Sequence, residues 1–311
     1  MGWIFSEMCK SQTRLDGKTA IVTGCNTGIG KETVLEFYKR GARVIMACRN
    51  LEKAEAAAGD LKKSTERLKN VGTLIIKQLD VSSFESVRKC AKDILETEPA
   101  IHLLVNNAGI MACPKELSVD GFELQFATNH LGHFLFTLLL LPRIIKSAPA
   151  RIVTIGSVAH VLGDGKMHFE DVNLDRGYTP WGAYARSKTA NILFAKELGK
   201  RLQGTGVTAY SVHPGVINTE LGRYIEETHP WIAWMLKVLG PYVLKTPVQG
   251  AQTTLYCSLD GKCANETGLY YAECAPIAPL ARARSANRAK ELWEESVKLV
   301  KLENYDPFKA A

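Results

Sequence analysis

Tyr184 and Lys188, in the segment YARSK, are the residues whose types and spacing point most directly to chemistry. On a helix, positions i and i+4 share one face, so a lysine ammonium can favour the phenolate form of a neighbouring tyrosine. Such a tyrosine can exchange a proton nearer neutral pH than its ordinary pKa of about 10 permits. The same spacing recurs at Tyr305 and Lys309, but Pro307 lies between them and argues against a helix there.

Ser157 ends the apolar run ARIVTIGS, which predicts a β-strand. Because open parallel sheets bind ligands at the carboxyl ends of their strands, we expect its hydroxyl to share a cleft with the tyrosine. The histidines show no ligand spacing such as H-E-x-x-H, so we expect local partners for them and no metal site. The histidines considered, four of the seven in the chain, are His130, His133, His160 and His213.

The segment TGCNTGIG follows the first predicted strand and places Gly24, Gly28 and Gly30 at a strand-to-helix turn. Glycines let the backbone lie against a pyrophosphate, and the positive end of the next helix attracts its charge. The spacing differs from G-x-G-x-x-G, so the prediction of a nucleotide site depends on the context of strand, turn and helix.

The second predicted strand ends in ACRN, where an NAD-selective protein would place a carboxylate for the ribose hydroxyls. Arg49 instead offers a cationic fork for a 2′-phosphate, and Lys31 could add a second charge. The sequence therefore favours NADP(H) as the cofactor. The alternative is that Arg49 is merely solvated.

Two further strand ends carry polar residues. Asp80, in QLDVSS, could accept from the adenine amino group, cap the next helix, or do both. Asn106 and Asn107, in NNAG, are expected to have a mainly structural role, in which their side chains tie neighbouring strands together.

The elements that must position these groups alternate between apolar strands and amphipathic helices. We expect strands at TAIVTG, ARVIMAC, GTLIIKQLD, HLLVNNAG, ARIVTIGS and GVTAYSVHPG, and helices near residues 31–40, 52–68, 85–97, 123–145 and 183–203. This order predicts an α/β fold with a doubly wound, Rossmann-type parallel sheet covered by helices on both faces.

The predicted organisation is a single domain over residues 15–303, with a flexible tail at 1–14 and a short tail at 304–311. Within the domain, the aromatic stretch from His229 to Lys245 predicts a lid-like helical insertion, which we place at 220–246. A surface helix pressed on the core is the alternative. The M-G-x-x-x-S start would permit myristoylation of Gly2, but a frayed tail is favoured.

Composition narrows the class of protein. The 311 residues are 46% hydrophobic and 23% charged, which excludes a disordered, collagen-like or coiled-coil chain. A net charge of +7 is spread along the sequence, so no nucleic-acid partner is predicted. Eight cysteines without a CxxC pair favour a reducing, cytoplasmic location. The longest apolar run, Phe134 to Leu141, is too short to cross a bilayer and predicts a buried helix.

The motifs TGCNTGIG, NNAG, Asn129, Ser157 and YARSK occur in the order of the short-chain dehydrogenase/reductases, which the chain resembles over nearly its whole length. The resemblance is strongest to the NADP-dependent retinol dehydrogenases of the microsomal and photoreceptor group. It rests on ACRN, ATNHLGHF, SVAH, ARSKTANILFAKEL, YSVHPGVINTEL and KTPVQGAQT.

The resemblance implies four catalytic residues. Tyr184 would exchange a proton with the substrate oxygen, and Ser157 would hydrogen-bond that oxygen. Lys188 would bind the nicotinamide ribose and lower the pKa of the tyrosine, while Asn129 would hold a water that links Lys188 to solvent. The residues implied for the cofactor are Gly24, Asn26, Thr27, Gly28, Ile29, Gly30, Arg49, Asp80, Val81, Asn107, Ala108, Gly109, Tyr184, Lys188, Pro214, Gly215 and Thr219.

The implied activity is NADP(H)-dependent interconversion of a lipophilic aldehyde or ketone and its alcohol, with retinal and retinol as the leading pair. A broad carbonyl or steroid reductase and a catalytically idle nucleotide-sensing scaffold are the alternatives. A homodimer paired through the long helix near 123–145 follows the family habit, although a wholly internal helix fits the sequence equally. Peripheral contact with endoplasmic reticulum or lipid-droplet membranes is a further expectation.

Two departures from the family pattern stand out. Gly156 occupies a position where many relatives carry another serine. The segment between Ser157 and Tyr184 is also longer than in many relatives, and we expect this insertion to form a loop beside the active site.

Overall fold

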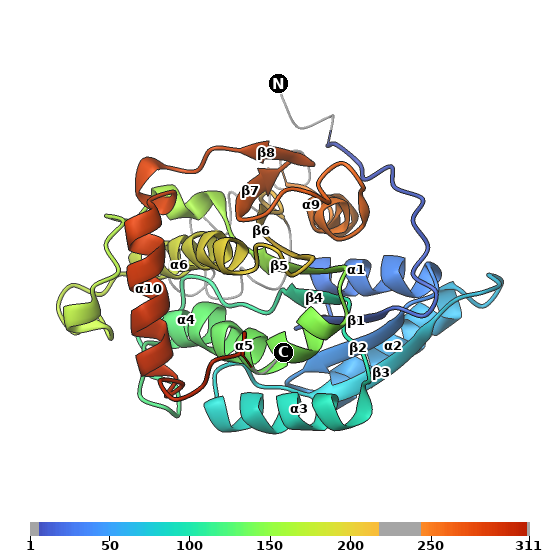
Figure 1. Ribbon diagram of the computed structural model, residues 1–311, viewed down its shortest axis with the longest axis horizontal. Coiled ribbons are helices and arrows are strands. Elements are labelled where there is room, and N and C mark those ends of the chain that lie inside the picture. The colour runs from blue at the N-terminus through green and yellow to red at the C-terminus, as the bar shows by residue number, and fades with distance from the viewer. Residues whose placement is uncertain (1–5, 218–243, 310–311) are drawn as a thin grey trace.

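Eight strands form one sheet in the order β3-β2-β1-β4-β5-β6-β7-β8 in the computed structural model, which describes residues 6–217 and 244–309 (Figure 1). They are β1 (Thr19–Thr23), β2 (Arg43–Cys48), β3 (Thr73–Gln78), β4 (Leu103–Asn106), β5 (Ala150–Ile155), β6 (Val207–His213), β7 (Leu269–Ala272) and β8 (Ala275–Ile277). Neighbours pair in parallel, except β7 and β8, which form an antiparallel hairpin. The strand order reverses between β1 and β4, where open sheets bind ligands.

Helices cover both faces of this sheet, as predicted. They are α1 (Gly28–Lys39), α2 (Leu51–Ser64), α3 (Phe84–Thr97), α4 (Leu124–Phe126), α5 (Gly132–Lys146), α6 (Pro180–Arg201), α9 (Pro247–Leu259) and α10 (Ala286–Leu299). Alternate strand residues enter two separate cores. Ile21 and Ile45 pack with α3, α5, α6 and α10, whereas Val22 and Met46 pack with α1, α2 and α9. Burial on both faces explains why the strands lack a polar alternation.

The long helix expected over 123–145 is interrupted. Residues Ala127–Leu131 form a π-helical turn between α4 and α5, and Asn129 lies in this turn. The segment Leu124–Lys146 is long and apolar enough to span a membrane, but 89% of its most apolar window is buried inside the protein. The helix is therefore largely internal to this chain, and pairing of two subunits through it stays a prediction.

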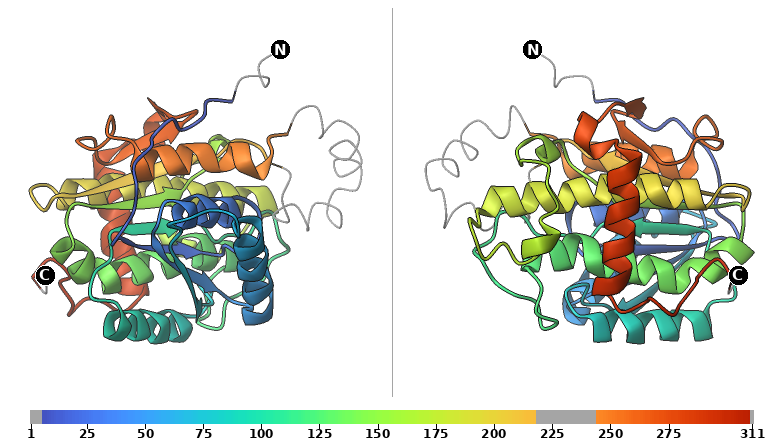
Figure 2. Two further views of the ribbon diagram at one scale, coloured as in Figure 1. Left: turned by 90° about the vertical axis from the view of Figure 1, so that its right-hand side faces the viewer. Right: turned by 60° about the vertical axis from the view of Figure 1, so that its left-hand side comes forward.

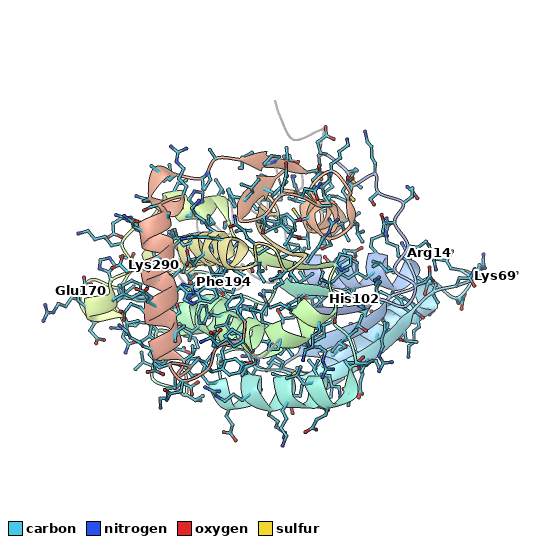
Figure 3. All side chains as sticks on the ribbon, in the orientation of Figure 1. Arg14, Lys69, His102, Glu170, Phe194 and Lys290 are labelled. Atoms are coloured by element: carbon cyan, nitrogen blue, oxygen red, sulfur yellow. The ribbon has the colours of Figure 1, made fainter. Side chains whose placement is uncertain are left out.

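Helix α10 crosses α6 and closes the core on that side (Figure 2). Its Trp293 ring contacts the rings of Phe134 on α5 and Phe194 on α6, with centroid distances of 5.2 and 6.0 Å. Phe194 lies deep in the molecule, whereas Lys290 on the outer face of α10 points to solvent (Figure 3). The last turn of the chain adds Phe308 against Trp293, so the packed unit extends beyond the boundary expected at residue 303.

The described part of the N-terminal segment, expected as a flexible tail, makes hydrogen bonds to the domain. Cys9 N donates to Gln252 Oε1 on α9 at 3.0 Å, and the hydroxyls of Ser11 and Thr13 donate to Leu259 O. Arg40 Nη1 donates to Thr13 O at 3.0 Å. Residues 9–13 are therefore attached to α9 and α1. The predicted lid over 220–246 lies outside the described residues except for 244–246.

Candidate active site

Helix α6 presents Tyr184 and Lys188 from successive turns near its start. Thr179 caps the helix by accepting from Gly182 N at 3.1 Å, and Pro180 occupies a first-turn position that suits proline. Both reactive side chains are buried, and the Lys188 ammonium lies 5.6 Å from the centre of the Tyr184 ring. The one-face arrangement expected from YARSK is therefore present. Lys188 Nζ donates to Ile155 O at the end of β5 at 3.0 Å.

Burial controls the acidity of this pair. It raises the pKa of Tyr184 to about 12, and hydrogen bonding by the Ser157 side chain opposes part of that rise. Burial also lowers the pKa of Lys188 to about 8. Desolvation of the phenolate is the main cause of the rise. The lowering of the tyrosine pKa by Lys188, which the resemblance implies, stays a prediction. At neutral pH the tyrosine carries its proton.

Ser157 follows β5 and begins the short 3-10 helix Val158–Val161. Its hydroxyl accepts from Ala159 N at 3.1 Å, while Val158 N donates to His213 Nδ1 at the end of β6. The carboxyl ends of β5 and β6 are therefore held together at this point. Hydrogen bonding by Ser157 lowers the pKa of Tyr184, which is consistent with the expected grouping of the two hydroxyls.

Asn129 lies beside this cluster. Its amide nitrogen donates to Ile110 O at 3.0 Å and to Ser187 Oγ at 2.9 Å, and its Oδ1 accepts from Ile110 N at 2.9 Å. These contacts leave one lone pair of Oδ1 available. A Cβ built on Gly109 would lie 3.0 Å from Asn129 Oδ1 and 3.8 Å from Lys188 Nζ. The end of NNAG thus borders both Asn129 and Lys188.

The glycine turn packs directly against NNAG. Gly24 has φ +60°, and a Cβ there would lie 2.7 Å from the Cβ of Ala108, so only glycine fits without a shift. Asn107 Nδ2 donates to the carbonyls of Thr23 and Gly24 at 2.9 and 3.1 Å. Asn106 Nδ2 donates to Thr137 Oγ1 on α5 at 2.9 Å. Both asparagines therefore make structural hydrogen bonds between elements.

The start of α1 is suited to an anion. Side chains cap the other long helices that begin in loops: Asn50 for α2, Ser83 for α3, Thr179 for α6, Thr246 for α9 and Ser285 for α10. Thr27 makes no such hydrogen bond at α1, and the first turn of α1 holds no acidic residue. The free N–H groups and the helix dipole at this end fit the pyrophosphate of a nicotinamide dinucleotide.

The charged residues expected near the adenosine differ in their exposure and in their partners. Arg49 is exposed at the end of β2. Lys31 is paired with Asp60 on α2 at 2.7 Å. Asp80 Oδ1 accepts from the main chain and hydroxyl of Ser82, at 2.9 and 2.6 Å. The cap of α3 is Ser83 rather than Asp80.

The remaining predicted cofactor residues border the same edge of the sheet. Asn26, Thr27, Gly28, Ile29 and Gly30 form the turn and the start of α1, Val81 is buried after β3, and Pro214 and Gly215 follow β6. Gly215 has φ +98°, and the Lys245 side chain packs against it and forms an ion pair with Glu273. Thr219 lies outside the described residues.

Sequence reasoning missed the buried groups that hold the site. Arg186, between the two reactive residues on α6, pairs with Glu123 at 3.2 Å, and its guanidinium lies 4.6 Å from the centre of the Phe126 ring. The inserted segment is anchored by Tyr178, whose hydroxyl donates to Cys113 O at 2.8 Å. These partners are far apart in sequence, so spacing gives no signal for them.

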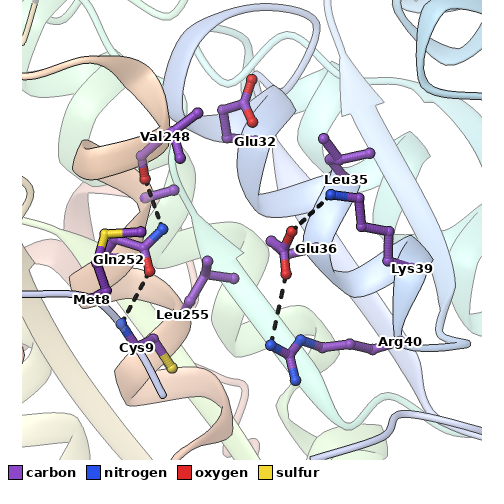
Figure 4. Close-up of a pocket in the computed structure, with 11 residues that line it drawn as sticks. Met8, Cys9, Glu32, Leu35, Glu36, Lys39, Arg40, Val248, Gln252 and Leu255 are labelled. Carbon is purple, nitrogen blue, oxygen red and sulfur yellow. Dashed lines mark hydrogen bonds and ion pairs between the residues drawn. The ribbon is translucent and has the colours of Figure 1, made fainter. Parts of the chain in front are cut away.

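A separate cavity of about 330 Å³ lies between the N-terminal segment, α1 and α9 (Figure 4). Met8, Leu35 and Leu255 are among its apolar lining, and Glu36 and Arg40 are among its charged lining. It contains none of the predicted catalytic residues. Among the described residues, no group of three or more His, Cys, Asp or Glu side chains could hold a metal ion.

The sequence is similar to those of known proteins. The family model for short chain dehydrogenases matches residues 18–230. Human retinol dehydrogenase 11 is 43% identical over 297 residues, covering 96% of this chain and 90% of the relative. Human retinol dehydrogenase 13 is 44% identical over 302 residues, covering 95% and 88%.

Solved structures show the same fold. An uncharacterized protein from Mycobacterium paratuberculosis superposes with a TM-score of 0.72 at 35% identity, covering 93% of this chain and 95% of that one. A short chain dehydrogenase from Shigella flexneri, complexed with NADP, has a TM-score of 0.65 at 24% identity, covering 85% and 100%. The chain therefore belongs to the short-chain dehydrogenase/reductase family and is a retinol dehydrogenase-like oxidoreductase within it.

Proposed function

We propose that this protein is an NADP(H)-dependent oxidoreductase that reduces a lipophilic aldehyde or ketone, with retinal as the leading substrate. The observation that carries the proposal is the buried pair of Tyr184 and Lys188, with the half-buried Ser157 at the carboxyl edge of the sheet. A phenol that keeps its proton at neutral pH suits the donor role that carbonyl reduction requires.

The cofactor would lie across the switch point between β1 and β4. Gly24, Gly28 and the uncapped start of α1 would hold its pyrophosphate, and Lys188 would hold the nicotinamide ribose. Arg49 would hold the 2′-phosphate, because it is exposed and has no acidic residue beside it in ACRN. When bound, NADPH supplies the hydride to the carbonyl carbon.

The side chains of the cluster would divide the remaining work. Ser157 would donate a hydrogen bond to the carbonyl oxygen, which orients the substrate and stabilises the developing negative charge. Tyr184 would then donate its proton to that oxygen. Lys188 would stay protonated and stabilise the phenolate left behind. The free lone pair of Asn129 Oδ1, next to Lys188, would bind the water through which the proton is replaced.

Apolar side chains beside the cluster favour a lipophilic substrate. Val158, Val161 and Leu162 follow Ser157, and Val216 follows Gly215. All four are exposed, although large apolar side chains are usually buried. An exposed apolar rim at a polar reaction centre fits a substrate with a long hydrocarbon part, and the same rim would touch a membrane surface peripherally. We infer a cytoplasmic protein that takes its substrate from such a surface.

The similarity to retinol dehydrogenases supports retinal over other carbonyl compounds. Loss of NADPH absorbance should be followed with all-trans-retinal, a steroid ketone and a medium-chain aldehyde. We expect the largest kcat/KM for retinal. A preference for the steroid would favour a steroid reductase, and no turnover of any carbonyl would favour a nucleotide-sensing scaffold.

The Tyr184→Phe variant tests the chemistry directly. It removes the transferable proton but keeps the ring, so kcat should fall by about 10²–10⁴-fold while NADPH binding, measured by fluorescence, is retained. Activity that survives the substitution would show that the proton donor is elsewhere.

A further inference from the structure

The hydroxyl of Thr23, at the end of β1, makes three contacts. It lies 2.9 Å from Asn107 N, 2.9 Å from Ala108 N and 2.8 Å from His133 Nε2. A threonine hydroxyl has one hydrogen and two acceptor lone pairs. The two main-chain N–H groups occupy both lone pairs, because an N–H can only donate. The hydroxyl hydrogen must therefore point to His133 Nε2.

This assignment fixes the protonation state of His133. Its Nε2 must be unprotonated to accept from Thr23, so the neutral ring carries its hydrogen on Nδ1. Nδ1 lies 3.2 Å from Asn129 O and donates to it. Burial independently favours the neutral ring, since it lowers the pKa of His133 to about 4. A charged ring would place three donors around one hydroxyl oxygen and leave the hydroxyl hydrogen without an acceptor.

A continuous buried path follows from these contacts. It runs from the N–H groups of NNAG through Thr23 and His133 to the main chain of Asn129. The Asn129 side chain then donates to Ser187 Oγ on α6, between the two reactive residues of that helix. The path joins the turn that borders the cofactor to the helix that carries Tyr184 and Lys188.

We propose that His133 is a positioning residue, which as the Nδ1–H tautomer holds the π-helical turn of Asn129 against the end of β1. The proposal rests on the function proposed above, because it gives Asn129 its place beside Lys188. His133 touches neither substrate nor cofactor. Its effect is to hold Asn129, and through Ser187 the helix α6, at a set distance from the glycine turn.

The tautomer can be measured without turnover. In protein labelled with ¹⁵N-histidine, two-bond ¹H–¹⁵N spectra distinguish a protonated from an unprotonated ring nitrogen. For the His133 ring, assigned by its loss in His133→Phe, we expect Nδ1 protonated and Nε2 unprotonated at neutral pH. Thr23→Val should shift the Nε2 signal by removing its donor. An Nε2–H tautomer or a charged ring would overturn the proposal.

The chain offers a matched control for the kinetic test. His130 is buried in the same π-helical turn and bonds Ser296 Oγ on α10 at 2.9 Å. Its ring lies among those of Phe126, Phe134 and Phe194, so phenylalanine should fit there. His130→Phe therefore removes a buried histidine and one hydrogen bond without touching Thr23.

His133→Phe should lower kcat for the reduction about tenfold or more, because small misplacements of reacting groups are costly. The KM and the fluorescence Kd for NADPH should stay within about twofold, since Thr23 still accepts from Asn107 and Ala108. His130→Phe should leave kcat within about twofold. In a Thr23→Val background, His133→Phe should cause little further loss of kcat, whereas in Thr23→Ser its effect should persist.

Equal losses of kcat in the two histidine variants would overturn the positioning role, as would full additivity of Thr23→Val and His133→Phe. Wild-type protein that binds NADPH but turns over no carbonyl would instead refute the proposed function. The two failures are therefore distinguishable.

Discussion

A buried ion pair ties the catalytic helix to the segment that leads to Asn129, and breaking it from one side should be costly. Arg186 Nη2 donates to Glu123 Oε2 at 3.2 Å, and neither side chain is more than 3% exposed. The guanidinium cannot lose its proton, so Glu123→Gln leaves a buried charge without a counter-charge. Removing one partner of a buried pair costs about 3–5 kcal/mol.

For a domain of this size, at about 2 °C per kcal/mol, Glu123→Gln should lower the unfolding midpoint by about 6–10 °C. Arg186→Met should cost less, because the Glu123 carboxylate still accepts from Gln125 N and Phe126 N at 2.8 Å each. The double variant removes both charges. It should be less destabilised than the sum of the single variants by more than about 2 kcal/mol.

Calorimetric unfolding of the four proteins at neutral pH gives this double-mutant cycle. Glu294→Gln is the control, since it breaks an exposed pair with Lys290 on α10 and should shift the midpoint by less than about 2 °C. If the two single effects simply add, or if Glu123→Gln is as mild as Glu294→Gln, the argument from buried charge is refuted.

Three further predictions concern acidity, cofactor choice and packing. Carbonyl reduction should be fastest below about pH 8 and decline above it, because Lys188 loses its proton there; a kcat/KM profile that rises through this range contradicts the assignment. Arg49→Glu should raise the KM for NADPH by about 10–100-fold and change that for NADH far less, and equal changes would remove the 2′-phosphate argument. Gly156→Ala should lower the free energy of unfolding by about 1–3 kcal/mol, since its Cβ would lie 2.7 Å from Ser211 Oγ. Gly59→Ala on α2, with no atom within 4 Å, should instead raise it by about 1 kcal/mol; denaturant unfolding of both variants tests the pair.

Local patterns in the sequence were sufficient to predict strands β1 to β6 and most of the helices that flank them. The hairpin of β7 and β8 and the helices α9 and α10 were not expected. Helix α6 was expected at 183–203 and spans Pro180–Arg201, and the strand expected before Ser157 ends two residues earlier, at Ile155. These features depend on hydrophobic periodicity and on short spacings, which the sequence shows directly. The break at Ala127–Leu131 carries neither glycine nor proline, so no local signal marks it.

Features set by tertiary burial could not be read in the same way. The pKa of Tyr184 rises because α6 is covered on all sides, and helical spacing alone suggests the opposite direction. Glu123 and Arg186 are 63 positions apart, and Thr23 and His133 are 110 apart. The attachment of Cys9 to Gln252 spans 243 positions. Only the folded chain brings these partners together.

The crossing of α6 by α10 has a consequence for assembly. Phe134 and Phe194 form an apolar surface that needs a cover, and Trp293 provides it from within the same chain. A second copy that approached the α5–α6 surface would compete with α10 for those aromatic side chains. A subunit that paired with these two aromatic side chains would therefore have to displace Trp293.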